Sequence, residues 1–194
     1  AFNFVPGVLG MIMMLICAMM TSIAIVREKE MGTMEILLVS PMKPIYTILS
    51  KIAPYFVLSF INFTTIILLS VFMLKVPIVG SLWSLVGVSL LYIYVALALG
   101  LLISTFTSSQ LAAMLISGMA LMLPAMLLSG MMFPVENMPV WLQWLSHIVP
   151  AKWYIIAVKA IMIKGLGIAS VVREVAILTL MGVVLTVVSL KKFK

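Results

Sequence analysis

Residues 27–41 read REKEMGTMEILLVSP and are a strongly charged stretch in a very apolar chain. Only 9% of the 194 residues are charged, yet five charged side chains fall here: Arg27, Glu28, Lys29, Glu30 and Glu35. They include three of the five acidic residues of the chain. Long apolar runs precede and follow the stretch, so we expect it to reach water between two membrane spans.

The composition indicates an integral membrane protein. Hydrophobic residues make up 65% of the chain, against roughly 45–50% in soluble domains. The apolar runs are continuous rather than alternating, and this favours helices over a barrel. We therefore predict an all-α, polytopic helical bundle, a single transmembrane domain over residues 1–194. Its five spans cover about residues 5–26, 45–74, 85–106, 111–132 and 171–190.

The charged stretch has the spacing of an interfacial helix over residues 27–41. Met31, Met34 and Leu38 recur at i, i+3 and i+7, so they are expected to rest on the apolar bundle. Glu28, Gly32 and Glu35 form a neighbouring polar strip, in which Gly32 leaves room for close approach of another backbone. The residues alone leave two interpretations open: a helix that binds a partner, or a solvated loop with scattered charges.

The segment between the fourth and last spans, residues 134–165, is too broken to be a simple crossing. Two short helical stretches are expected in it, with Asn137 as N-cap and Pro139 in the first turn. We predict an outer re-entrant hairpin with an amphipathic first helix, and treat a sixth full crossing as the alternative. The candidate functional residues of this hairpin are Pro134, Glu136, Asn137, Pro139, Trp141 and Pro150.

The polar and charged residues of the chain argue against several classes of function. The net charge of +7 comes from basic residues near span ends, where they meet lipid phosphates, so we expect no nucleic acid. Cys17 stands alone, His147 is the only histidine and aspartate is absent, so neither a catalytic nor a metal site is predicted. No phosphate-binding loop motif occurs, so ATP hydrolysis is not expected in this chain, nor is a bound cofactor.

Lysine and arginine counts give the expected orientation. Placing residues 27–43 and the C-terminus in the cytoplasm puts seven basic residues inside and five outside. The inner set includes the tail cluster Lys191, Lys192 and Lys194, which directly follows the last span.

Two motifs carry a resemblance to a known family. Residues 30–41, EMGTMEILLVSP, resemble the E-x-G-T-x-E-x-L-x-x-x-P signature of permeases of the type-2 ATP-binding-cassette exporter family. Residues 128–139, LSGMMFPVENMP, followed by Trp141, Leu142 and Pro150, are similar to a second marked region of that family. The order of spans also agrees, so the likeness covers essentially the whole chain.

The resemblance implies a half-transporter of six crossings, of which this chain would be a C-terminal fragment without the first crossing and its extracytoplasmic domain. It implies pairing with an identical or related permease and with two copies of a separate ATPase, which would bind ATP and magnesium. It further implies that residues 28–41 dock on the ATPase, and that residues 139–163 form the outer hairpin. The docking contacts would be Glu28, Glu30, Gly32, Thr33, Glu35, Leu38 and Pro41.

The function so predicted is that of a permease subunit in the bacterial cytoplasmic membrane. Few polar groups lie in the spans, so the cargo is expected to be apolar or amphipathic, with drug-like efflux favoured. Two other classes stay open at this point. One is a secondary transporter or channel, which would need buried charges or inverted repeats. The other is a membrane assembly scaffold or embedded enzyme without ATP coupling.

Overall fold

The computed structural model describes residues 4–193, and within them every regular element is helical. The elements, in chain order, are α1 (Phe4–Glu30), α2 (Thr33–Val39), α3 (Pro44–Phe72), α4 (Leu82–Phe106), α5 (Gln110–Leu128), η1 (Val135–Asn137), α6 (Val140–Ser146), α7 (Pro150–Met162), η2 (Ile168–Val171) and α8 (Val172–Lys192). Five of these helices, α1, α3, α4, α5 and α8, are long and apolar enough to cross a membrane. The all-α polytopic fold predicted from the sequence is confirmed, and the chain is a multi-pass membrane protein.

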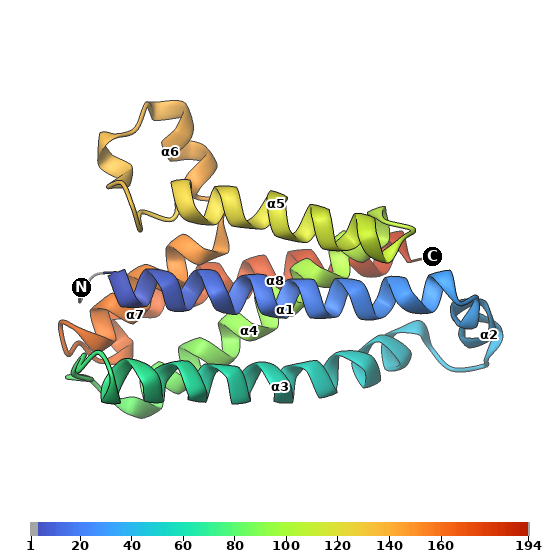
Figure 1. Cartoon of the computed structure of the whole chain (residues 1–194), viewed down its shortest axis with the longest axis horizontal. Coiled ribbons are helices and arrows are strands. Elements are labelled where there is room, and N and C mark those ends of the chain that lie inside the picture. The colour runs from blue at the N-terminus through green and yellow to red at the C-terminus, as the bar shows by residue number, and fades with distance from the viewer. Residues whose placement is uncertain (1–3, 194) are drawn as a thin grey trace.

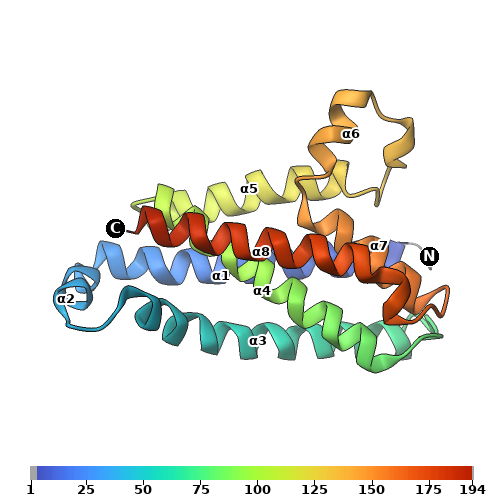
Figure 2. The same cartoon turned by 180° about the vertical axis from the view of Figure 1, so that it is seen from behind.

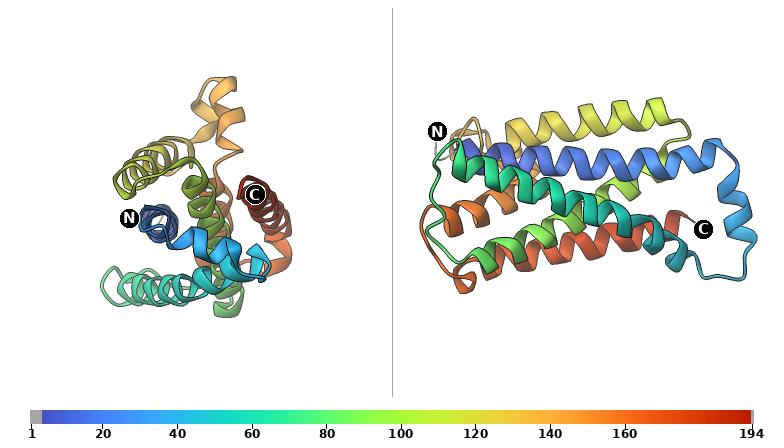
Figure 3. Two further views of the ribbon diagram at one scale, coloured as in Figure 1. Left: turned by 90° about the vertical axis from the view of Figure 1, so that its right-hand side faces the viewer. Right: turned by 60° about the horizontal axis from the view of Figure 1, so that its bottom comes forward.

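The five long helices lie side by side, with the connecting elements gathered at two ends (Figure 1). One end, here called the α2 end, holds α2, the start of α3, the start of α5 and the end of α8 (Figures 1 and 2). The other, here called the hairpin end, holds α6, α7 and the α3–α4 connection. Seen end-on in Figure 3, α4 passes through the middle of the bundle, and it packs against α1, α3, α7 and α8.

A stacked pair of tyrosines fixes the core near the hairpin end. The rings of Tyr92 in α4 and Tyr154 in α7 are parallel within 4°, with their centroids 4.0 Å apart. The Tyr92 hydroxyl donates to the carbonyl oxygen of Gly10 in α1 at 2.7 Å, and the Tyr154 hydroxyl lies 2.8 Å from Ser89 Oγ. Both rings are fully buried. The pair therefore joins three helices at one point and satisfies its own polar groups.

The crossing of α1 and α4 depends on a small residue. A Cβ on Gly100 would collide with the carbonyl oxygen of Ala18 and lie 2.9 Å from the Thr21 side chain. Close approach through small residues is the usual way in which membrane helices gain packing energy.

Helix α7 is more deeply packed than an interfacial helix would be. Its 13 residues span about 20 Å at 1.5 Å per residue, which is short of a crossing. Yet most of its side chains are buried against α1, α4 and α8. Helix α6 instead stands away from the bundle beside the end of α5, and its axis makes an angle of 80° with that of α7 (Figure 1).

Candidate functional site

The charged stretch does not form one helix over residues 27–41, which corrects the sequence prediction. Helix α1 continues through Arg27, Glu28 and Lys29 to Glu30, because arginine, lysine and glutamate are good helix formers. The break comes at Gly32, whose φ of +72° is left-handed and suits glycine. A new seven-residue helix, α2, then begins at Thr33. The turn is tied together by Thr33 Oγ1, which donates to the Glu28 carbonyl oxygen at 3.2 Å.

Met34 faces the bundle as predicted, but the rest of the buried face of α2 differs from the prediction because the helix restarts at Thr33. Met34 is only 8% exposed and packs with Ile25, Ile48 and Leu101, while Leu37 lies partly buried beside them. Met31 and Leu38, predicted to rest on the bundle, are exposed. Burying Met34 contributes about 2 kcal/mol to holding α2 in place.

Ionic and polar contacts tie the residues that precede α2 to three other helices. Glu28 forms an ion pair with Lys51 of α3. The Lys29 ammonium donates to the carbonyl oxygen of Ser104 in α4 and lies 5.2 Å from the Phe193 ring. The carboxylate of Glu30 accepts from the backbone N–H of Gln110 at 2.9 Å and from its Nε2 at 2.5 Å, at the start of α5.

The other side of α2 is free. Glu35 is exposed and has no hydrogen bond or ion pair within residues 4–193. Around it lie Ile36 and Val39, which are 73% and 85% exposed, and Leu38, which is also exposed. We call these four residues the α2 outer face. Figure 3 shows α2 at the extreme end of the bundle, past the ends of the long helices.

The end of α2 is set by proline. Ser40 is extended (φ −64°, ψ 144°), as the residue before a proline prefers, and the exposed Pro41 turns the chain away. Lys43 is extended in the same way before α3 begins.

The hairpin residues lie at the opposite end. Pro134 precedes η1, which contains the exposed Glu136 and Asn137. Pro139 rather than Asn137 is the N-cap of α6, so that helix begins after the proline, which corrects the predicted cap. Trp141 is exposed on α6, and Pro150 opens α7. Whether the two helices make a re-entrant hairpin or a bent sixth crossing stays a prediction.

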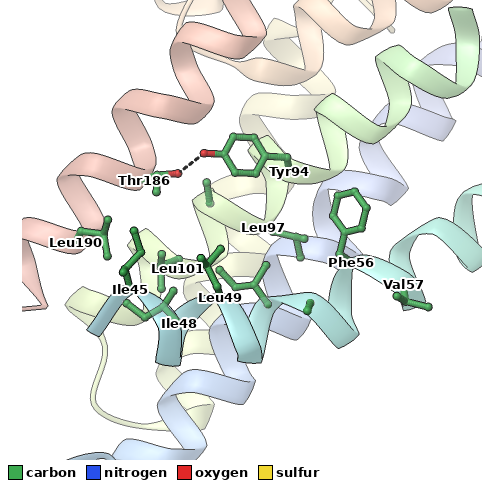
Figure 4. A pocket seen from close by; sticks show the side chains of 13 residues that line it. Ile45, Ile48, Leu49, Phe56, Val57, Tyr94, Leu97, Leu101, Thr186 and Leu190 are labelled. Atoms are coloured by element: carbon green, nitrogen blue, oxygen red, sulfur yellow. Dashed lines mark hydrogen bonds between the residues drawn. The ribbon is translucent and has the colours of Figure 1, made fainter. Parts of the chain in front are cut away.

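An apolar cavity of about 590 Å³ lies between α3, α4 and α8, nearer the α2 end. Its lining is aliphatic and aromatic, with residues such as Leu49, Phe56 and Leu97 (Figure 4). Its only two polar side chains, Tyr94 and Thr186, satisfy each other through a 2.8 Å hydrogen bond (Figure 4). An apolar molecule or chain therefore suits it better than a charged solute.

The family follows from comparison with known proteins. The family model described as "ABC-2 family transporter protein" matches residues 1–191. The chain belongs to the ABC-2 transporter family. No solved structure matches it.

Three permeases of Escherichia coli (strain K12) are similar to this ABC-2 chain. "Probable multidrug ABC transporter permease YbhS" is 34% identical over 161 residues, which cover 83% of this chain and 43% of YbhS. "Probable multidrug ABC transporter permease YbhR" is 35% identical over 160 residues, 82% of this chain and 43% of YbhR. "Inner membrane transport permease YhhJ" is 29% identical over 197 residues, 100% of this chain and 51% of YhhJ. The chain spans about half the length of these relatives.

Some residues that shape the site in this ABC-2 chain escaped sequence reasoning. Lys51, Ser104 and Gln110 hold the residues before α2, yet each lies far from them in the sequence. The one signal of these contacts in the sequence was the polar turn at residues 105–110, which separates two apolar runs. The pattern gave no indication that this turn meets Glu30.

Proposed function

We propose that this chain is a permease subunit of an ATP-driven exporter in the bacterial inner membrane, and that α2 docks on a separate ATPase subunit. The observation that carries the proposal is the α2 outer face. It combines a carboxylate that is unpaired within the described part of the chain with three exposed aliphatic side chains at the end of the bundle. Exposed apolar side chains around a charged group are typical of a surface that binds a protein partner.

The three glutamates in and before α2 have two different roles. Glu35 is free to contact a basic group of the ATPase. Glu28 and Glu30 are already engaged with Lys51 and Gln110, so they position α2 instead of docking it. Gly32 supplies the turn that presents the α2 outer face.

Coupling then is a mechanical process. ATP and magnesium bind to the ATPase, and its closure moves α2. Because the base of α2 is tied to α3, α4 and α5, the long helices move with it rather than letting α2 swing independently. A second permease, identical or related, completes the path.

The cargo we propose is apolar or amphipathic and drug-like. Two of the similar proteins are named as probable multidrug permeases. The apolar cavity between α3, α4 and α8 is compatible with such molecules or with lipid chains. A secondary transporter fits less well, because all five acidic residues, Glu28, Glu30, Glu35, Glu136 and Glu174, lie near helix ends or in connections.

Co-purification tests this function. The tagged permease, expressed with its neighbouring reading frames and extracted in mild detergent, should retain a subunit with a phosphate-binding loop. Reconstituted vesicles should then hydrolyse ATP and move an apolar dye. An intact complex with no nucleotide-hydrolysing subunit would contradict the proposal.

A further inference from the structure

A second cavity, of about 390 Å³, lies at the hairpin end between the end of α5, η1, α6 and α7. The groups that could contact a ligand there are Ser129, Glu136, His147, Lys152, Ile155 and Lys159. This cavity lies at the opposite end of the bundle from α2, so nothing in the proposed ATPase docking uses it.

Two ammonium groups line this cavity from one face of α7. Lys152 and Lys159 are seven residues apart, with Ile155 and Ile156 between them on the same face. Lys152 is only 8% exposed, and its Nζ donates to Ser146 Oγ at 3.0 Å and lies 5.3 Å from the Trp153 ring centre. A buried ammonium that has a neutral partner and no carboxylate is costly unless an anion joins it.

One hydroxyl group that lines the cavity lacks a hydrogen-bond partner among the described residues. Ser129 is 3% exposed, and its Oγ makes no hydrogen bond to any residue between 4 and 193. Buried hydroxyl groups are nearly always hydrogen-bonded, so an unpaired one that lines a cavity indicates a missing acceptor.

The cavity does not neutralise its own charge. Glu136 is its one carboxylate, and this exposed side chain forms no ion pair with either lysine in the described structure. Two ammonium groups against one carboxylate leave a formal charge of +1, with histidine counted as uncharged. The net positive charge and the unpaired Ser129 hydroxyl therefore both favour an anionic ligand.

We propose that this cavity binds a phosphate group, carried either by a phospholipid or by a free phosphate ion. Lys152, Lys159 and Ser129 donate to the phosphate oxygens, because ammonium and hydroxyl groups suit a ligand with several acceptors. In a phospholipid, Ile155 and Ile156 contact the apolar part that follows the phosphate group. The ligand is either a phospholipid headgroup or free phosphate, and the two sources differ in the apolar contact.

The fluorescence of Trp153 can test this site in the full chain in detergent, without the ATPase. Trp83, Trp141 and Trp144 are exposed, so their replacement by phenylalanine leaves Trp153 as the single reporter beside Lys152. The probes are dihexanoyl phosphatidylglycerol, inorganic phosphate and dihexanoylglycerol, which has the chains without the phosphate. We expect a saturable change with phosphatidylglycerol and none with dihexanoylglycerol.

Substitutions identify the groups that bind. Lys152→Gln and Lys159→Gln should each weaken binding by about tenfold, since each removes a charge-assisted hydrogen bond. If the variant of the more buried Lys152 misfolds, Lys159→Gln still tests the site. The control is Lys164→Gln, which lies outside the cavity and should bind the ligand as the parent does. Tighter binding of phosphatidylglycerol than of phosphate would assign a lipid, and equal binding would assign the free ion.

Four results would overturn the proposal. One is the absence of a saturable response to either phosphate-bearing probe. Another is binding of dihexanoylglycerol as tight as that of phosphatidylglycerol, or binding unchanged in both lysine variants. The last is binding seen only after Glu136→Gln, which would make Glu136 the native counterion of the lysines.

Discussion

Gln110 donates two hydrogen bonds to the carboxylate of Glu30, one from its backbone N–H at 2.9 Å and one from its side-chain Nε2 at 2.5 Å. The two residues are 80 positions apart in the chain. Their contact joins the last residue of α1 to the first residue of α5, directly beside the turn into α2. A group that the family resemblance assigns to docking thus also contacts a second long helix.

The first prediction concerns that contact. Glu30→Ala removes the acceptor of the Gln110 backbone N–H, so hydrogen exchange at the Gln110 amide should become faster. Exchange in the middle of α5 should not change. The matched control is Glu136→Ala, an exposed carboxylate at the other end of the bundle. An unchanged exchange rate at Gln110 in the Glu30 variant would show that the contact is not formed in the membrane.

Charge reversal separates docking from positioning. Glu35→Lys should leave thermal stability unchanged, because Glu35 has no partner among residues 4–193, and should abolish ATP-driven transport. Glu28→Lys places two positive charges where Glu28 and Lys51 now form an ion pair, so it should lower thermal stability as well. Melting in detergent and dye transport in vesicles measure the two effects. Normal transport by the Glu35 variant would rule out a docking role for this residue.

The turn at Gly32 predicts a graded effect of substitution. A side chain at φ +72° costs about 1–2 kcal/mol in a left-handed conformation, although no atom of the described residues lies within 4 Å to clash with its Cβ. Gly32→Ala should therefore reduce the ATPase that co-purifies by about fivefold or more, and Gly32→Asn should reduce it less, since asparagine tolerates this region. Gly118→Ala, in open space within α5, is the control and should have no effect. Equal retention by the alanine and asparagine variants would be inconsistent with this account of the turn.

The tyrosine pair predicts a stability effect far from α2. Tyr92→Phe keeps the stacked ring and removes the hydrogen bond to Gly10, so the free energy of unfolding should fall by about 0.6–1.5 kcal/mol. Tyr46→Phe, at an exposed position of α3, should change nothing. Unfolding by denaturing detergent measures both. A Tyr92 variant as stable as its parent would mean that the hydroxyl finds an equivalent partner elsewhere.

Sequence reasoning succeeded for the long helices because their signal is local. Length and hydropathy alone placed five apolar helices, since an apolar run of that length has few other ways to bury itself. The predicted ends were less accurate. The first span was predicted to end at Arg27, but the helix itself continues to Glu30, because arginine, lysine and glutamate are good helix formers and the chain turns only at Gly32.

The site was harder to predict than the fold, because its contacts join distant residues. The charged stretch itself stands out, but the pairing of Glu28 with Lys51 and of Glu30 with Gln110 depends on how the helices pack. The buried face of α2 was assigned partly wrongly for a related reason. A seven-residue helix that restarts at Thr33 presents Met34, as predicted, and Leu37 to the bundle, whereas Met31 and Leu38 are exposed because the periodicity counted from Met31 does not continue across the break at Gly32.

The most direct test of the central claim is a photo-crosslink from α2 to its partner. A benzophenone side chain at Val39 of the α2 outer face, which is 85% exposed, should attach to the ATPase in a purified, ATP-hydrolysing complex. The same group at Val140 of α6, which is 68% exposed at the hairpin end, should not attach to it. Crosslinking from position 39 alone is the result we predict. Crosslinking from position 140 instead, or none from position 39 in an active complex, would contradict the docking of α2 on the ATPase.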